Sequence, residues 1–249
     1  MSATSPLPID RPFGLSDDVA SVQVSDSQTP LRGTNTSLPP SRSRRAAARV
    51  GRRQRSVVAA ELSARDRLVL RRLEQHRYLS TMQLEAFVFT GHASPASAAR
   101  TTRRVLARLS REGLIRPLNR RIGGVRAGSS ATVWQLAPAG VRLLREEAGK
   151  GYRTHEPSER FLRHCLAVAD AHLRLRALQA APDVEQIEVQ VEPDSWRRYS
   201  GSGGEARWLQ PDLAAVITSG EFEDRLFIEV DCGTESLPTL LRKCEQYEA

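Results

Sequence analysis

Lysine, cysteine and long apolar runs are all scarce in this sequence of 249 residues. Only two of its 37 basic residues are lysines, which points to an arginine-favouring genome. The cysteines, Cys165, Cys232 and Cys244, are widely spaced and form no C-x-x-C pair, which argues against a disulfide framework or a zinc site. No apolar run approaches the ~18 residues of a membrane span, and no basic start precedes an apolar core as in a secretory signal. These absences predict a cytoplasmic protein with reduced thiols and no membrane partner.

Positive charge is concentrated in the middle of the chain. Residues 1–60 have a formal charge of +5, residues 61–150 of +10 and residues 151–249 of −7, within a total of +8. An arginine-favouring genome explains arginine in place of lysine, but it does not explain this uneven distribution. An electropositive segment beside an acidic one is typical of a nucleic-acid-binding module joined to a second domain.

Residues 1–60 are expected to form a disordered, arginine-rich arm. Up to about Pro40 the sequence is rich in Ser, Thr, Pro and Asp, and it cannot bury enough apolar surface to offset its ordering entropy. The stretch 41–60 then carries seven arginines and no acidic residue. A solvated tail and a flexible arm that adds phosphate contacts are both open interpretations. The seven are Arg42, Arg44, Arg45, Arg49, Arg52, Arg53 and Arg55.

Residues 61–150 are predicted to form a winged helix-turn-helix. Ser63 is the expected N-cap of a first helix, and Thr81 is the expected N-cap of a shorter second one. A third helix is predicted over residues 96–112, because apolar side chains recur there at helical spacing, and Gly113 ends it.

A hairpin is predicted after the third helix. Short strands are expected over residues 114–118 and 132–136, joined by an Arg/Gly-rich turn over 119–130. The segment 134–140, Trp-Gln-Leu-Ala-Pro-Ala-Gly, resembles the strand-to-helix junction of winged-helix regulators, and a further helix is expected from Pro138. Three helices and then a hairpin are the element order of that fold.

The third predicted helix carries the candidate DNA-reading residues. Four of its arginines, at positions 100, 104, 108 and 111, fall on the face opposite to Val105, Leu106 and Leu109. In a helix-turn-helix this helix enters the major groove, where arginine reads guanine bidentately or binds phosphate. A merely solvated basic helix is the alternative, and the basic turn that follows argues against it. The candidates are Arg100, Thr101, Arg103 and Arg104 at the bases, Arg108 and Arg111 toward phosphates, and Arg120, Arg121 and Arg126 in the turn.

Residues 151–249 are predicted to form an α/β domain. His164 and His172, two turns apart on its first helix, are interpreted as core or interface residues and not as ligands. Its elements are a helix over 158–179, strands over 186–192, 209–217 and 226–231, and a closing helix from about Ser236.

Two acidic motifs in this domain resemble the restriction-endonuclease-like fold. Gln-Pro-Asp-Leu at 210–213 opens one predicted strand, and Phe-Ile-Glu-Val-Asp at 227–231 closes the next. The resemblance implies that Asp212, Glu229 and Asp231 bind Mg²⁺, which activates water against a phosphodiester. On one strand, Glu229 and Asp231 are expected to point to the same face.

The sequence departs from that fold at one catalytic position. The lysine that usually stands two residues after the glutamate is here Asp231. Either a basic residue of the last helix, Lys243 or Arg242, supplies the positive charge, or catalysis is lost. An inactive relic of the fold, and carboxylates that are only surface charge, are further alternatives.

Together these features resemble the replication-relaxation family of actinobacterial plasmids and integrative elements. The resemblance runs from Ser63 to the end, and the run Glu-Val-Asp-Cys-Gly-Thr-Glu at 229–235 is its most specific part. It implies a role in plasmid replication or DNA relaxation, with duplex DNA and other replication or mobilisation proteins as partners. Members usually continue past the last helix, so we expect a truncated core.

The sequence therefore predicts an α/β protein, with a winged helix-turn-helix followed by an endonuclease-like core. Duplex-DNA binding in mobile-element maintenance is the favoured function. A Mg²⁺-dependent nuclease or nickase stays open. So does a winged-helix repressor whose second domain dimerises or binds a partner, and the sequence leaves a homodimer open.

Overall fold

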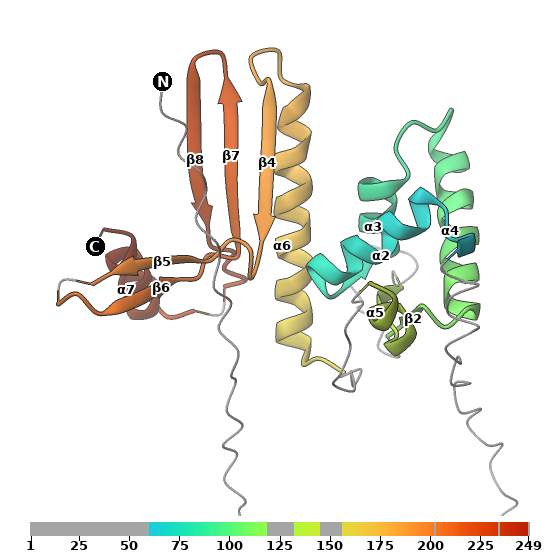
Figure 1. Ribbon diagram of the computed structural model, residues 1–249, viewed down its shortest axis with the longest axis horizontal. Helices are drawn as coiled ribbons and strands as arrows, with labels where there is room; N and C mark the ends of the chain where they lie inside the picture. The colour runs from blue at the N-terminus through green and yellow to red at the C-terminus, as the bar shows by residue number, and fades with distance from the viewer. Residues whose placement is uncertain (1–59, 119–131, 145–155, 202, 234, 249) are drawn as a thin grey trace, which may run out of the picture. The chain divides into compact units, whose positions relative to one another are not determined.

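The computed structural model describes residues 60–118, 132–144, 156–201, 203–233 and 235–248. Within these ranges the protein is mixed α/β, with helices and three small antiparallel sheets (Figure 1). The α/β class predicted from the sequence is confirmed. Across the described ranges no helix combines the length and apolarity required to cross a membrane.

The first helix, α2 (Ala64–His76), begins at the predicted residue. Its N-cap is Ser63, whose hydroxyl oxygen accepts a hydrogen bond from the Asp66 N–H. The Asp66 carboxylate in turn accepts from the Ser63 N–H and hydroxyl at 2.9 and 2.8 Å, which completes a capping box.

The next two helices differ little from their predictions. α3 (Thr81–Val88) is capped by Ser80, so the predicted N-cap at Thr81 is wrong by one residue. The reason is that Ser80 has the extended backbone of an N-cap, and its hydroxyl is placed for a capping box. α4 (Pro95–Arg111) ends just before Gly113, whose φ of 72° is a conformation that glycine adopts without strain.

A three-stranded sheet accompanies these helices. Its order is β1 (Leu79–Ser80), β3 (Val133–Leu136) and β2 (Ile115–Pro117), and all its pairings are antiparallel. The hairpin strands match the prediction, whereas the two-residue β1 is too short to leave a periodic signal. The turn predicted over 119–130 lies outside the described residues, so the wing stays a prediction.

A close approach explains the glycine in the segment 134–140. α5 (Pro138–Leu144) follows β3 closely and packs against Leu114, the residue before β2. A Cβ atom at Gly140 would lie 2.2 Å from the carbonyl oxygen of Leu114, which is backbone and cannot move aside. Only glycine therefore allows this contact.

One apolar core joins these elements. It is built mainly from leucines that are fully buried, and it includes Ala169 from the following helix, α6 (Glu159–Ala177). α6 continues into a short 3-10 turn, η1 (Leu178–Ala180). Leu70, Leu84, Leu106 and Leu109 are among the core residues with no exposed surface.

The second half contains a sheet that packs on α6. Its order is β4 (Gln186–Val191), β7 (Leu213–Ser219) and β8 (Phe222–Ile228), and all its pairings are antiparallel. Val168 of α6 packs with Val191 and Leu213 of the sheet.

Two strand predictions in this half are wrong. The strand expected over 209–217 is two strands in different sheets, β6 (Ala206–Leu209) and β7. Pro211 lies in the break, where it lacks the N–H that a continuous ladder needs. β6 pairs with an unpredicted strand, β5 (Arg197–Ser200). The strand expected to run to Asp231 ends at Ile228, three residues earlier.

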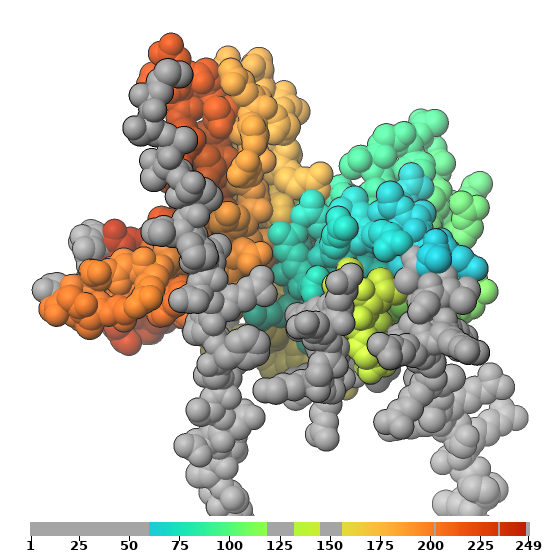
Figure 2. Space-filling view, in the orientation of Figure 1, coloured from blue at the N-terminus to red at the C-terminus, as the bar shows by residue number. Residues whose placement is uncertain are grey.

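The two halves meet along α6. Gln83 of α3 donates from Nε2 to the Leu166 carbonyl oxygen at 2.8 Å and to Asp170 Oδ1 at 2.7 Å. His76 of α2 and His172 of α6 are buried and share a hydrogen bond of 3.0 Å. In the space-filling view the atoms of α2 and α3 abut those of α6 (Figure 2). The domain boundary predicted at residue 150 falls outside the described residues and stays a prediction.

Candidate functional site

The face of α4 opposite to the core carries exposed arginines. Its inner face, with Thr102, Leu106 and Leu109, is buried, and Thr102 Oγ1 donates to the carbonyl oxygen of Ala98 at 2.9 Å. The helix contains no acidic residue. Thr101 is half-buried at the boundary of the two faces. Across the part of the chain that is described, no carboxylate forms an ion pair with the exposed arginines, which are Arg100, Arg103, Arg104 and Arg111.

Arg108 differs from these four arginines because its guanidinium is held by two carboxylates. Nη2 lies 2.5 Å from Oδ1 of the buried Asp66, and Nη1 lies 3.1 Å from Oε1 of Glu112. Partial burial by itself would lower the pKa of Arg108, but hydrogen bonds and charge from Glu112 and Asp66 raise it above its usual value. Arg108 was predicted to contact a phosphate. In the structure its guanidinium instead joins α4 to α2.

The other predicted DNA-binding arginines, Arg120, Arg121 and Arg126, lie outside the described residues, as does the arm over residues 1–59. Their contribution stays a prediction.

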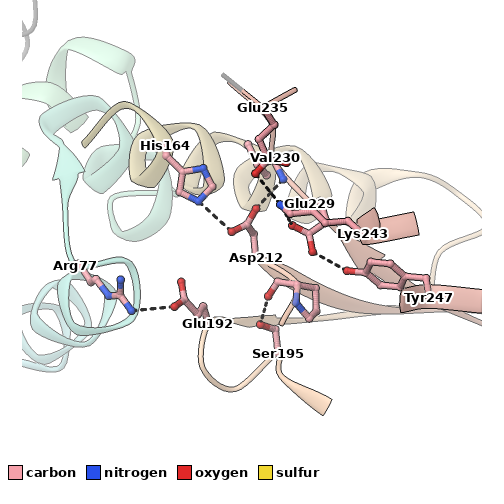
Figure 3. Close-up of polar contacts among 11 residues, drawn as sticks. Arg77, His164, Glu192, Ser195, Asp212, Glu229, Val230, Glu235, Lys243 and Tyr247 are labelled. Atoms are coloured by element: carbon pink, nitrogen blue, oxygen red, sulfur yellow. Dashed lines mark hydrogen bonds and ion pairs between the residues drawn. The ribbon is translucent and has the colours of Figure 1, made fainter. Parts of the chain in front are cut away.

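The second candidate site lies where β7 begins and β8 ends (Figure 3). Asp212 Oδ2 accepts from the Val230 N–H at 2.7 Å, and its Oδ1 lies 3.0 Å from Nε2 of His164 on α6. The hydrogen bond to Asp212 is the main reason why the pKa of His164 is raised. Asp212 therefore joins α6 to the end of β8.

Glu229 is bound by the last helix, α7 (Leu237–Glu248). Lys243 Nζ donates to Glu229 Oε2 at 3.0 Å and to Glu235 Oε1 at 2.8 Å, and the Tyr247 hydroxyl donates to Glu229 Oε1 at 2.9 Å (Figure 3). Burial alone would lower the pKa of Lys243, but Glu235 and Glu229 raise it. Burial, together with Glu229, also raises the pKa of Tyr247.

Of the two basic candidates on α7, the structure brings Lys243 to the predicted glutamate. Arg242 is exposed. Tyr247 and Glu235 are partners that the sequence interpretation missed. The spacing of Lys243 and Tyr247, four residues apart on a helix, is the signal that places them on one face.

The three carboxylates of the predicted magnesium site have protein hydrogen-bond partners in the structure, and the site stays a prediction. Both oxygens of Asp212 and both of Glu229 face protein donors, and Asp231 Oδ1 accepts from the Gly233 N–H at 3.0 Å. Because Glu229 and Asp231 follow the end of β8, the strand alternation that would align them does not apply. In the described ranges, no three His, Cys, Asp or Glu side chains are placed to hold a metal ion.

The two histidines of α6 have different surroundings. His172 is buried against His76 and Phe87, which agrees with its interpretation as a core residue. His164, in contrast, binds Asp212, 48 positions away in the sequence. No local pattern signals that contact.

Comparison with known proteins identifies the family of this chain. A family model described as replication-relaxation matches residues 70–249. A search of curated proteins and a search of solved structures each returned no match. The matched segment includes α4, Asp212, Glu229 and Lys243, and it is well over half of the sequence. The chain therefore belongs to the replication-relaxation family.

Proposed function

We propose that this protein binds duplex DNA through α4, as the recognition helix of a winged helix-turn-helix, during replication or relaxation of a plasmid or mobile element. The observation that carries the proposal is the outer face of α4, where four exposed arginines have no acidic partner among the described residues. Duplex DNA presents a dense row of phosphates, and guanine offers two acceptors in the major groove to a bidentate arginine.

The arrangement around α4 supports the proposal. α2, α3 and α4 are followed by the antiparallel strands β2 and β3, which is the element order of a winged helix. Arg108 fixes α4 to α2 through Asp66, so the exposed arginines project from a rigid support.

The proposal is tested by titrating a labelled duplex with the full chain and with Arg100→Ala and Arg104→Ala, at several salt concentrations. A bidentate guanine contact predicts a loss of about 1–3 kcal/mol for the preferred sequence. A phosphate contact instead predicts an equal loss for all sequences and a salt slope smaller by about one. The matched control is Arg163→Ala, an exposed helical arginine of α6. Unchanged affinity in both α4 variants would refute the proposal.

A second candidate function is phosphodiester cleavage at Asp212, Glu229 and Lys243. The observation that favours it is Lys243, which reaches Glu229 from α7 and supplies the positive charge that the sequence lacks at residue 231. Against it, the carboxylate oxygens already face protein donors, so no step through Mg²⁺ is derived. Nicking of supercoiled plasmid by the wild type, lost in Glu229→Gln, would establish cleavage. An intact plasmid at every metal concentration would exclude it.

A further inference from the structure

Two arginines from different helices lie over one buried aromatic ring. One end of α2 reaches α6, and α3 lies against both helices (Figure 1). The guanidinium carbon of Arg72 on α2 is 5.3 Å from the centroid of the Phe87 ring, and that of Arg176 on α6 is 5.6 Å from it. Phe87 is 2% exposed, so the ring holds both planar groups in fixed positions.

These two positive charges have no carboxylate partner among the described residues. Arg72 Nη1 donates to the neutral Gln75 Oε1 at 2.7 Å, and Arg176 Nη1 donates to the Phe87 carbonyl oxygen at 3.4 Å. Nε of Arg72 is buried and has no hydrogen-bond partner. Burial and the charge of Arg176 both lower the pKa of Arg72, which means that its charged form lacks compensation.

Two other partly buried cations among the described residues are compensated by acids. Arg108 has Asp66 and Glu112, and Lys243 has Glu229 and Glu235. Two guanidinium groups held together without an acid are an unfavourable arrangement, and a bound anion would relieve it. The planar guanidinium forks of the two arginines suit the oxygens of a tetrahedral phosphate.

We infer that Arg72 and Arg176 form a binding site for a phosphate group between α2 and α6. The phosphate belongs either to a free phosphate ester or to the backbone of DNA. The inference rests on this cluster alone and does not depend on the role of α4.

The direct test compares inorganic phosphate with sodium chloride at equal ionic strength and pH. Tm is measured for the full wild-type chain, for Arg72→Gln and Arg176→Gln, and for the controls Arg71→Gln and Arg174→Gln, which change exposed neighbours on the same helices. Phosphate should raise Tm in the wild type and both controls, because a ligand of the native state stabilises it. Binding in the two site variants should be at least about tenfold weaker, a loss of about 1.4 kcal/mol.

Two outcomes would overturn the inference. No rise in Tm beyond that of sodium chloride means that the cluster does not bind phosphate. An equal rise in all five proteins means an adventitious ion only. If Arg72→Gln fails to fold, Arg72→Lys keeps the charge but not the fork. Phosphate binding at least several-fold weaker in this variant than in the wild type supports the site, and wild-type binding contradicts it.

DNA titration distinguishes the two sources of phosphate. If the DNA backbone supplies it, Arg72→Gln weakens binding to all duplexes alike and lowers the salt slope by about one. If a free ester supplies it, the variant keeps its DNA affinity and loses phosphate binding. Arg100→Ala and Arg104→Ala should bind inorganic phosphate normally, so failure of the α4 proposal would be seen separately.

Discussion

The candidate sites in the two halves of the described chain differ in whether their charged groups have protein partners. On α4, exposed arginines have no acidic partner among the described residues. In the second half, both carboxylate oxygens of Asp212 and both of Glu229 face protein donors. Net charge alone would assign DNA to the basic half and a metal to the acidic half. Only the first assignment is supported by charged groups without a protein partner in the described ranges. Such unpaired charges therefore indicate function better than the net charge of each half.

The same distinction separates neighbours on one helix. Arg104 and Arg108 are four residues apart on α4, and the sequence offers both as DNA contacts. Arg108 binds Asp66 and Glu112, whereas Arg104 is exposed. Arg108 therefore supports stability, and Arg104 is available for binding.

The largest expected effect comes from breaking the ion pair between Arg108 and Asp66. Asp66→Ala removes a buried carboxylate that binds Arg108 and caps α2, and it should lower the free energy of unfolding by about 3 kcal/mol. Urea denaturation measures this loss. Glu159→Ala, which breaks the exposed pair with Arg163, should cost less than about 1 kcal/mol. If both variants lost the same free energy of unfolding, the buried pair would be no more stabilising than the exposed one.

Acid should weaken the contact between the two halves by nearly as much. Burial lowers the pKa of His76 from 6.5 to about 4 and also lowers that of His172. As the pH falls, His76 is protonated in the unfolded chain before it is protonated in the folded one. Its contribution to the free energy of unfolding is therefore fully present above pH 6.5 and is lost toward pH 4. We expect a loss of roughly 3 kcal/mol from His76 over that window. Urea denaturation at several pH values measures it.

Removing the histidine pair provides the control for the acid experiment. In His172→Gln, the part of the acid sensitivity that comes from His172 should disappear, although the variant is less stable at neutral pH. A wild-type stability that stays constant from pH 7 to pH 4.5 would contradict the buried neutral pair.

A moderate effect on Mg²⁺ binding is expected when the ammonium group of Lys243 is removed. Lys243→Met leaves Glu229 and Glu235 without their shared ammonium group, so Mg²⁺ should stabilise this variant more than the wild type, by about 1 kcal/mol. Melting with and without Mg²⁺ measures the difference. A large Mg²⁺ shift in the wild type that Asp212→Asn abolishes would instead support the predicted metal site.

The smallest effect is expected at His164. Its pKa is raised by Asp212, so its contribution to stability is present below pH 6.5 and is lost as the pH rises through its folded value. Wild-type Tm should therefore decline slightly on the alkaline side, and His164→Gln should show a flatter profile there. An unchanged profile would mean that this pair contributes little.

The sequence predicted the helices better than the strands. Ser63, Pro138 and Gly113 mark boundaries by local chemistry, and the structure places helix ends at or beside them. The sequence does not reveal the split between β6 and β7, because apolar residues stand both before Gln210 and after Asp212, and β5 has no apolar alternation.

The sites were predictable only where one helix carries them. The exposed arginine face of α4 follows from spacing alone. The bond from Arg108 to Asp66, that from His164 to Asp212 and the Arg72–Arg176 pair each join distant segments. Such contacts depend on tertiary packing, which the spacing of residues along the chain does not reveal.

Charge reversal on α4 tests the central claim most directly. Duplex affinity would be measured for Arg104→Glu and for the matched Arg163→Glu on α6, both at exposed helical positions. The account predicts that Arg104→Glu binds at least about tenfold more weakly than the wild type, while Arg163→Glu binds nearly as well. Wild-type affinity in Arg104→Glu, or an equal loss in both variants, would contradict the assignment of α4 as the DNA-binding surface.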